Sequence, residues 1–294
     1  MPEKAMEMPT RWDYRAEELG RNIYRFRKNK LAVLGLAWLL FTGVVAVFCY
    51  QISPYPEDEA TPHFYEVLKP PSSQHLFGTD EAGRDILSRI IIGARISLGI
   101  GSLTVVISAM IGVPLGLIAG YRGGILDAII MRIADTIFAI PPLVLALCVT
   151  IVLTPSLQNT MIAIAITWWP WYARLVRGEV LSAKEEVYVE AARSLGARTG
   201  TVIFKEILPN ILSPIIVKMS LDMGFSILTL AALGFLGLGA RPPIPEWGTM
   251  AGFGRVHLPM YWWLSAFPGI AIFMVVLASN FFGDGLRDAL DVEI

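Results

Sequence analysis

The chain has 294 residues, of which 54% are hydrophobic and 17% charged, and its formal net charge at pH 7 is −1. Its mean hydropathy of +0.57 lies well to the apolar side of an ordinary soluble domain, which indicates a membrane protein. The near-zero charge gives no ground for a nucleic-acid partner. Both cysteines, Cys49 and Cys148, fall in apolar stretches, so a disulfide framework is not expected.

Six apolar stretches are long enough to cross a bilayer, whose hydrocarbon core of roughly 30 Å needs about 20 helical residues. The third and fourth share one uncharged run, 136–173, in which the polar, proline-bearing residues 154–159 predict a turn. We therefore predict an all-α membrane protein in contact with lipid. Its six transmembrane helices are expected at residues 31–52, 96–120, 125–153, 159–180, 211–239 and 262–283.

Positive charge predicts the orientation of these helices. Residues 11–30 contain seven Lys or Arg and residues 174–205 contain six, whereas the remaining loops carry fewer. Positive loops mark the cytoplasmic face, which places both termini and residues 190–210 inside. The predicted organisation is a basic cytoplasmic segment at 1–30, a first transmembrane helix at 31–52, an external segment at 53–95, a five-helix core at 96–284 containing a cytoplasmic loop at 182–210, and a cytoplasmic tail at 285–294.

The loop at 182–210 has the pattern of two short helices around a glycine corner. Ser182 and Glu185 stand in the S-x-x-E relation of a capping box, which predicts a helix start. An apolar face then recurs at 187, 191 and 195, and Gly196 sits where a left-handed C-terminal cap is wanted. A second helix is expected from Thr201 until Pro209 interrupts it. Such a loop either docks a partner or lies as an amphipathic hairpin on the inner leaflet.

The same loop resembles the EAA motif of membrane subunits of ATP-binding-cassette importers. That motif is E-A-A, three residues, Gly, and then Leu-Pro thirteen residues beyond the Gly. Glu206 departs from the resemblance, because Ile is frequent at that position. The positions that match are Glu190, Ala191, Ala192, Gly196, Leu208 and Pro209, which the resemblance implies form an ATPase-coupling loop.

Four further stretches resemble permeases of the dipeptide, oligopeptide and nickel group, and in particular the second of their two permeases. They are RFRKNKLAVLGL at 25–36, HLFGTDEAGRDILSRIIIGARISL at 75–98, FLGLGARPPIPEWG at 235–248 and GDGLRDALD at 283–291. The resemblance implies a type I importer permease fold in a prokaryotic plasma membrane. It also implies a heterodimer with a paralogous permease, two ATPase subunits that bind ATP and Mg, and an extracytoplasmic solute-binding protein.

Two regions are candidates for the solute pathway. Gly237, Gly239, Pro242 and Pro243 follow the fifth span, where irregular backbone either shapes an external gate or forms a rigid turn. Charged residues inside spans are costly against lipid, so they are expected to snorkel, to pair, or to face water. Arg132 and Asp135 in the third span have the spacing of a local ion pair, whereas Asp222 in the fifth lies deeper and is a candidate pathway residue. Lys218 precedes Asp222 by four residues.

The sequence contains no motif that indicates a nucleotide-binding, metal-binding or catalytic site. GTDEAGRD at 78–85 lacks the Lys and Ser or Thr of a phosphate-binding loop, so no cofactor is expected in this chain and a different chain must hydrolyse ATP. His63, His75 and His257 are interpreted as isolated, without metal-ligand spacing, and no nucleophile–base motif indicates an enzyme. Dipeptide or oligopeptide import by alternating access is the favoured function. Import of nickel or another solute, or a channel or receptor that uses the loop as a scaffold-docking site, are the alternatives.

Overall fold

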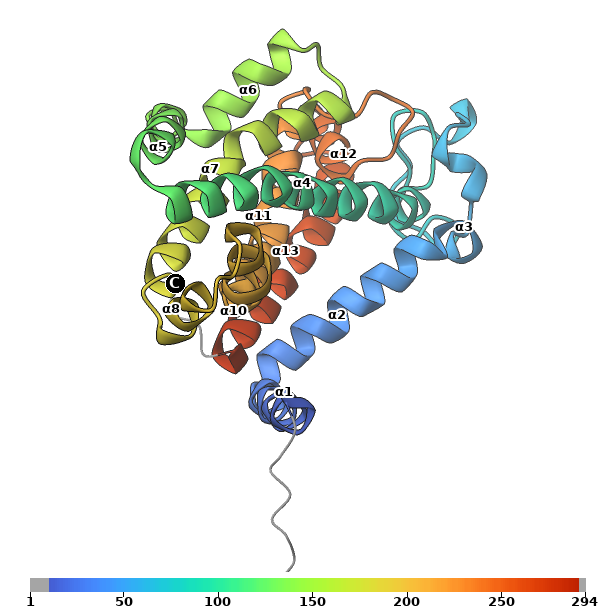
Figure 1. The fold of residues 1–294 in the computed structure, drawn as a ribbon. Coiled ribbons are helices and arrows are strands. Elements are labelled where there is room, and N and C mark those ends of the chain that lie inside the picture. The colour runs from blue at the N-terminus through green and yellow to red at the C-terminus, as the bar shows by residue number, and fades with distance from the viewer. Residues whose placement is uncertain (1–10, 291–294) are drawn as a thin grey trace, which may run out of the picture.

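The computed structural model describes residues 11–290, and every regular element within them is helical (Figure 1). Short 3₁₀ turns at Pro56–Glu59, Phe64–Glu66 and Arg255–His257 and a π-helical turn at Val202–Ile207 complete the set. The α-helices are α1 (Arg11–Lys28), α2 (Lys30–Val47), α3 (Cys49–Ile52), α4 (Ile86–Arg122), α5 (Gly124–Phe138), α6 (Pro142–Val152), α7 (Leu157–Ala183), α8 (Val187–Ser194), α9 (Thr199–Thr201), α10 (Leu208–Asn210), α11 (Leu212–Phe235), α12 (Trp247–Gly254) and α13 (Trp263–Leu290).

Four of these helices, α2, α4, α11 and α13, are long and apolar enough to cross a membrane. The α5–α6 pair raises this number to five if both helices together form one span. The predicted number of six also includes α7, which has 27 residues but carries polar and aromatic side chains that lower its hydropathy. The all-α membrane architecture is therefore confirmed, although length and hydropathy alone identify four or five of the six expected spans.

The third predicted span is broken instead of continuous. α5 and α6 meet at an angle of 91°, separated by residues 139–141. Pro141 and Pro142 lie at the break, and a proline cannot continue the hydrogen bonding of a preceding helix. The expectation of one helix over 125–153 is therefore wrong. Its uncharged sequence conceals a corner that two consecutive prolines impose.

Several boundaries differ from the sequence-based ones. The second long helix begins at Ile86 rather than near residue 96, because Asp85 caps it by accepting a hydrogen bond from the Ser88 amide at 2.8 Å. α13 continues to Leu290, so most of the segment expected to be a tail is helical. The remaining residues of that segment, like residues 1–10, lie outside the described range.

Close packing of α4 against α7 is made possible by glycines spaced four residues apart. A Cβ added at Gly112 would lie 2.4 Å from the Trp169 carbonyl oxygen, and one added at Gly116 would lie 2.6 Å from that of Ala173. Gly120 continues the same stripe toward Val180. Without a hydrophobic driving force between helices in lipid, such small-residue stripes allow backbones to approach closely enough for van der Waals packing.

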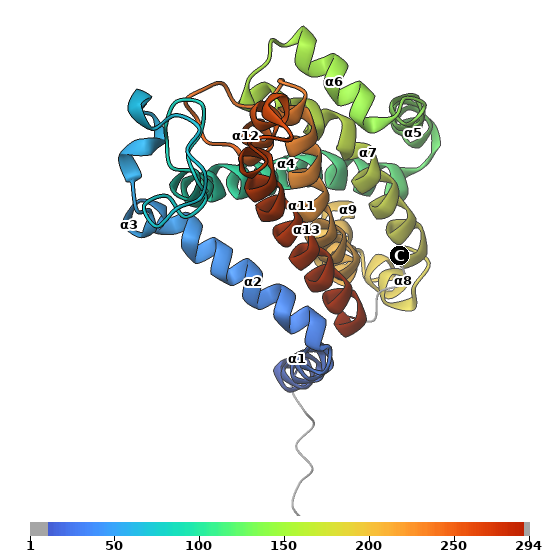
Figure 2. The ribbon, with the colours of Figure 1, turned by 180° about the vertical axis from the view of Figure 1, so that it is seen from behind.

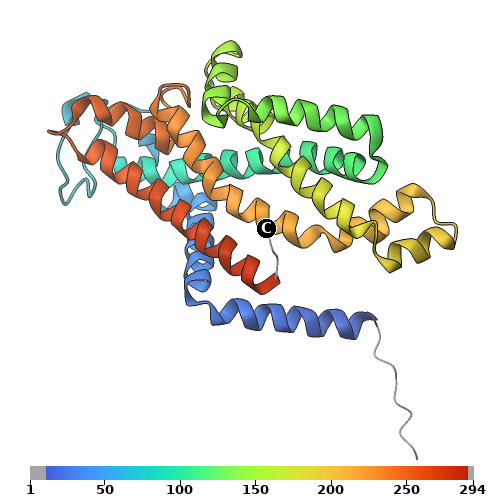
Figure 3. The ribbon, with the colours of Figure 1, turned by 90° about the vertical axis from the view of Figure 1, so that its left-hand side faces the viewer.

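The first helices of the chain pack against its last one. α2 lies against α13, as seen from behind in Figure 2. A Cβ added at Gly35 would lie 2.6 Å from the Ala278 carbonyl oxygen. α1 turns away from the direction of α2 (Figure 3). Asn29, between the two helices, caps α2 and donates to the Asp288 carboxylate at 3.4 Å. The two ends of the described chain are thus held together on one side of the molecule.

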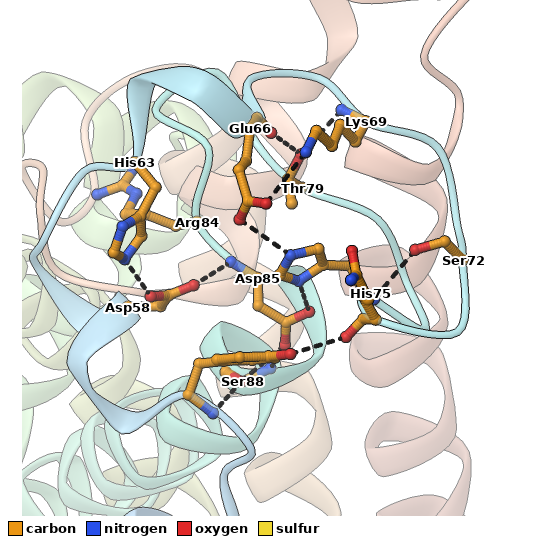
Figure 4. Close-up of polar contacts among 12 residues, drawn as sticks. Asp58, His63, Glu66, Lys69, Ser72, His75, Thr79, Arg84, Asp85 and Ser88 are labelled. Atoms are coloured by element: carbon orange, nitrogen blue, oxygen red, sulfur yellow. Dashed lines mark hydrogen bonds and ion pairs between the residues drawn. The ribbon is translucent and has the colours of Figure 1, made fainter.

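Residues 53–85 form a segment without long helices that folds over the start of α4 (Figure 4). The ring of His75 is buried, with Nδ1 3.0 Å from Asp85 Oδ1 and Nε2 3.2 Å from Glu66 Oε2. Each ring nitrogen therefore lies within hydrogen-bond distance of a carboxylate oxygen. Asp58 accepts from the Asp85 amide at 2.6 Å and also contacts His63. The interpretation of these histidines as isolated is therefore wrong.

Glu66 joins this network to the surface of the segment. The Lys69 ammonium and the His75 ring bond to its carboxylate, and they lower the pKa of Glu66 from its ordinary value. A carboxyl whose folded pKa is lowered contributes stability above its unfolded pKa and loses it as the pH falls through the folded one. The Glu66 contacts therefore stabilise the segment at neutral pH and weaken only in acid.

The 53–85 segment and the 182–210 loop lie at opposite ends of the molecule (Figure 3). α4 extends from the first end toward the second, and α7 and α11 continue directly into the 182–210 loop. These three helices are in mutual contact, so they form the structural connection between the two ends.

We predict that Gly116→Ala destabilises the folded chain by about 1–3 kcal/mol, because the added methyl group overpacks the contact between α4 and α7. The measurement is thermal unfolding of the detergent-purified protein. Gly99→Ala on the same helix is the matched control, since a Cβ there meets nothing within 4 Å. An equal loss of stability in both variants would show that the stripe does not limit helix approach.

We predict that His75→Gln loosens the 53–85 segment, with a loss of about 1–3 kcal/mol, because the shorter side chain cannot keep both hydrogen-bond contacts, to Asp85 and to Glu66. Limited chymotrypsin digestion reports this as faster cleavage after Tyr65, whose side chain is fully exposed. His257→Gln is the control, since that ring contacts one carboxylate at 3.3 Å and is partly exposed. Unchanged cleavage of the His75 variant would show that the contacts of His75 with Asp85 and Glu66 do not hold the segment in place.

Candidate functional site

The 182–210 loop begins later than its sequence indicates. α7 continues through Ser182 to Ala183, and α8 starts at Val187 after a turn. Its N-cap residue is Glu186, which makes no side-chain capping bond. The predicted capping box of Ser182 and Glu185 is therefore wrong, because the incoming helix keeps Ser182 inside its own last turn.

The glycine corner is confirmed. Gly196 has φ = +80°, the left-handed conformation that favours glycine. Its amide donates to the Arg193 carbonyl at 2.9 Å, and the Ala197 amide donates to the Ala192 carbonyl at 3.0 Å. This pair of bonds is the Schellman arrangement at a helix end. A Cβ at Gly196 would meet nothing within 4 Å, so only backbone conformation constrains this residue within the chain.

The second helix of the loop is continuous through the proline. It begins at Thr199, passes through the π-helical turn, and ends as α10 at Asn210. Leu208 donates to the Ile203 carbonyl in the wider π pattern, and the Asn210 side chain bonds the Glu206 carbonyl at 2.6 Å. Pro209 therefore sits within a helix whose pattern has already changed, instead of interrupting it as predicted.

One side of the loop is buried against the long helices. Val189, Val202 and Ile207 have no solvent exposure, and they join one apolar cluster with Val176 and Val180 of α7. Ile211 and Ile215, at the start of α11, belong to the same cluster. The loop is thus fixed to both helices by a core of its own, at the boundary where each helix ends.

The other side presents apolar side chains to solvent. Val187, Leu195 and Phe204 are 77%, 88% and 64% exposed. The motif residues lie on or beside this exposed face: Glu190, Ala191, Gly196 and Pro209 are exposed, while Ala192 and Leu208 are partly buried. Exposed apolar patches of this kind mark interaction surfaces. Four of the six predicted coupling residues are therefore accessible on the loop, whereas Leu208 also packs against the apolar cluster.

Asp222 lies in the interior of α11 with 5% exposure. Its carboxylate accepts a hydrogen bond from the Lys218 ammonium at 2.6 Å, one helical turn away. Tyr172 of α7 interacts with the same carboxylate, although its buried hydroxyl makes no hydrogen bond of standard geometry. Pairing offsets the insertion cost of each charge, about 2.5–3.5 kcal/mol at a helix centre.

Ion pairs also tie α5 to α7. Arg177 binds the Asp127 carboxylate with two bonds of 2.5 and 2.7 Å, and Arg174 pairs with Asp135. The predicted local pair of Arg132 and Asp135 does not form, because Arg174 takes the carboxylate from a neighbouring helix. The short first half of the broken span is thus held to α7 by charge as well as by packing.

The candidate gate residues lie beyond the end of α11. Gly237 is left-handed at φ = +85° and ends the helix, and a Cβ at Gly239 would lie 2.7 Å from the Gly234 Cα. Pro242 and Pro243 are exposed. The Pro243 carbonyl accepts a bond from buried Arg89 at 3.1 Å, which joins this stretch to the start of α4. It therefore lies at the same end of the molecule as the 53–85 segment.

No group of three or more His, Cys, Asp or Glu residues within 11–290 has the arrangement of a metal site. The paired carboxylates of the 53–85 segment are occupied by His75, His63 and backbone amides.

Comparison with known proteins identifies the group to which this fold belongs. Residues 112–294 match the family of binding-protein-dependent transport system inner membrane components, and residues 19–71 match the N-terminal transmembrane domain of oligopeptide transport permease C. The chain has 46% identity with the dipeptide transport system permease protein of Alkalihalophilus pseudofirmus over 92% of its own length and 88% of the relative's.

Two further relatives cover the chain to the same extent. The oligopeptide transport system permease protein of Bacillus subtilis is 44% identical, with 92% of this chain and 88% of the relative covered. The glutathione transport system permease protein of Pectobacterium atrosepticum is 45% identical, with 92% and 89% covered.

Solved structures of the MetNI methionine transporter in inward-facing conformations share the fold. One has a TM-score of 0.57 at 20% identity and covers 69% of this chain and 97% of its own. Another has a TM-score of 0.54 at 21% identity, with 68% and 96% covered. The predicted importer-permease fold is thereby confirmed. This chain belongs to the family of inner-membrane permease components of binding-protein-dependent, ATP-binding-cassette transport systems.

Proposed function

We propose that this chain is the permease subunit of an ATP-driven importer of short peptides. It forms the pathway together with a paralogous permease subunit, receives peptides from an extracytoplasmic binding protein, and is moved by two ATPase subunits that bind ATP and Mg. The names of its relatives support peptides as the solute, since dipeptide, oligopeptide and glutathione carriers all transport short peptides.

The observation that carries this proposal is the two-sided burial of the 182–210 loop. Its inner side is fixed in the apolar cluster with α7 and α11, whereas Leu195 and Phe204 are exposed on its outer side. A surface of this kind suits a partner subunit whose movement must reach the membrane helices. An amphipathic hairpin held only by lipid would not need the buried anchor of Val189 and Ile207.

Movement of the docked loop is expected to tilt α7 and α11 together. The cluster of Val176, Val180, Ile211 and Ile215 joins both helices to the loop, so the unit moves as a rigid body. ATP binding closes the ATPase pair and favours the outward-open pathway, and hydrolysis resets it. The ATPase must bind the two loop positions with different affinities, because a partner shifts an equilibrium only by that difference.

The proposed orientation places the 182–210 loop and both termini in the cytoplasm. The bond between Asn29 and Asp288 supports termini on a common side, and the 53–85 segment lies at the end opposite the loop (Figure 3). We assign the external face to this segment and to the stretch containing Gly237, Gly239, Pro242 and Pro243. Both form the surface on which the binding protein docks and from which peptide enters.

Gly196→Asp is expected to insert into the membrane normally and to reduce ATP-driven dipeptide uptake at least about tenfold, through backbone strain and a charge at the ATPase contact. Uptake into proteoliposomes containing the complete importer measures this effect. Gly196→Asn is the matched control, because Asn has the size of Asp and can adopt the left-handed conformation but adds no charge. Full uptake by the Asp variant would refute the docking role.

Leu195→Asp is expected to leave the stability of the isolated subunit within about 0.5 kcal/mol, because the side chain is 88% exposed, and yet to weaken retention of the ATPase subunits. Co-purification in detergent measures the retention. Tyr65→Asp provides the control, since Tyr65 is fully exposed at the opposite end of the molecule. Equal retention in both variants would place the ATPase elsewhere.

The orientation predicts opposite labelling of two engineered cysteines. In a background without Cys49 and Cys148, Ala192→Cys should react with an impermeant thiol reagent only in inverted vesicles, because residue 192 lies in the cytoplasmic loop. Glu81→Cys, at a side chain 47% exposed, should react only in intact cells. Reaction of Ala192→Cys from outside would reverse the topology.

A further inference from the structure

Two ion pairs and two aromatic rings form one continuous series of contacts across α5, α7 and α11. Lys218 bonds Asp222 at 2.6 Å, and its Nζ lies 5.6 Å from the centre of the Trp171 ring. The Trp171 and Phe138 ring centroids are 4.7 Å apart. At the other end, the Arg174 guanidinium lies 4.5 Å from the Phe138 ring centre and pairs with Asp135. We call this set of six side chains the mid-membrane ladder: Asp135, Phe138, Trp171, Arg174, Lys218 and Asp222.

The ladder lies deep within the helices. Trp171 is fourteen residues from the start of α7 and twelve from its end, or roughly 20 Å from either end at 1.5 Å per residue. Asp222 is ten residues into α11, or roughly 15 Å. Half of a hydrocarbon core is about 15 Å thick, so these side chains belong to the middle of the membrane. Asp135 stands just before the corner between α5 and α6.

At this depth the exposure of the ladder requires an explanation. The side chains of Arg174 and Asp135 are 50% and 49% exposed, and Trp171 is 47% exposed. Lipid offers no hydrogen bonds to a charged side chain, so charges in spans face a water-filled cavity or another protein surface. Half-exposed ion pairs retain free donor and acceptor positions, because a carboxylate accepts several bonds and a guanidinium donates five.

We propose that the mid-membrane ladder is a binding site for the charged termini of a peptide in the solute pathway. Lys218 and Arg174 bind the carboxylate terminus, and Asp222 and Asp135 bind the ammonium terminus. The Trp171–Phe138 pair contacts the peptide between its ends. This inference rests on the proposed function and deepens it, because it assigns the recognised chemical class to named residues of this chain.

Three observations favour a peptide over a neutral solute. Both signs of charge occur at each end of the ladder, which suits a zwitterion in either direction. Each aromatic ring is already contacted by a cation of this chain, so an arriving ammonium group can exchange with it. The three contacts that link the two ion pairs are each shorter than 6 Å, and an extended peptide advances about 3.3–3.6 Å per residue, so a peptide of about four or five residues reaches both pairs.

Water access and protection by peptide test the position of the site. In the assembled importer without Cys49 and Cys148, Phe225→Cys lies one turn beyond Asp222, where the native side chain is 52% exposed. It should react with a charged thiol reagent, and a tetrapeptide delivered by the binding protein with ATP should slow this reaction about tenfold. Val44→Cys in α2, 54% exposed on an apolar helix, should not react.

Failure of Phe225→Cys to react in every nucleotide state would place the ladder against lipid or in a subunit interface and overturn the inference. Reaction without protection by peptide would overturn the binding role. If the unmodified importer takes up no peptide, the proposed function fails and the inference fails with it. If the unmodified importer takes up peptide and either labelling result is negative, the inference is overturned but the proposed function is not.

Terminus specificity provides the second test. Lys218→Met should lower uptake of a tetrapeptide with a free carboxylate about tenfold relative to the same tetrapeptide with an amidated carboxyl group, compared with the unmodified importer. The same binding protein serves every variant, so its own selectivity cancels from this ratio. Lys218→Arg should restore the ratio. Arg132→Met is the matched control, because Arg132 lies in α5 outside the ladder. An unchanged ratio in Lys218→Met would overturn the assignment.

Discussion

The apolar cluster beneath the 182–210 loop is the interaction on which the rest of this structure depends. Val189, Val202 and Ile207 are removed completely from solvent against residues of α7 and α11. Fully burying side chains of this size contributes about 1.5–3 kcal/mol each, which is enough to hold a short helical pair in one position. A loop attached in this way is part of the helices that it joins, and force applied to its outer surface reaches both of them.

The second constraint is the lipid that surrounds the membrane-spanning helices. Lipid cannot bond to charged side chains or to free backbone groups, so a charged side chain in a span needs a partner other than lipid. Asp127 and Asp135 of α5 pair with arginines of α7, and Lys218 pairs with Asp222 within α11. The corner between α5 and α6 falls next to these pairs. Polar contacts and broken helix geometry therefore concentrate in one layer, as is frequent where transporters bind their solutes.

The two ends of the molecule are built differently for their different contacts. At the end with the 182–210 loop, apolar side chains are exposed above an apolar anchor. At the opposite end, the 53–85 segment is held by a buried network of carboxylates around His75 and by Arg89, which also bonds the backbone after α11. A fixed polar network suits a docking surface that keeps its shape while the helices beneath it move.

The sequence by itself determined the features that depend on neighbouring residues. Runs of apolar residues identify the long helices, and the left-handed cap at Gly196 follows from a glycine placed directly after an amphipathic helix. The spacing from Glu190 to Pro209 carries the resemblance of this loop to the EAA motif. The apolar face at 187, 191 and 195 follows from the sequence pattern. That this face is exposed to solvent follows only from the structure.

Only the tertiary structure decided the contacts between distant residues. Asp135 pairs with Arg174, 39 residues away, instead of Arg132 three residues away, because α7 brings its guanidinium to the same face. His75 joins carboxylates on both sides only after the 53–85 segment folds back on α4. Local spacing cannot reveal such choices, since a charged side chain selects its partner by distance and burial in the folded chain, and both are set by helix packing.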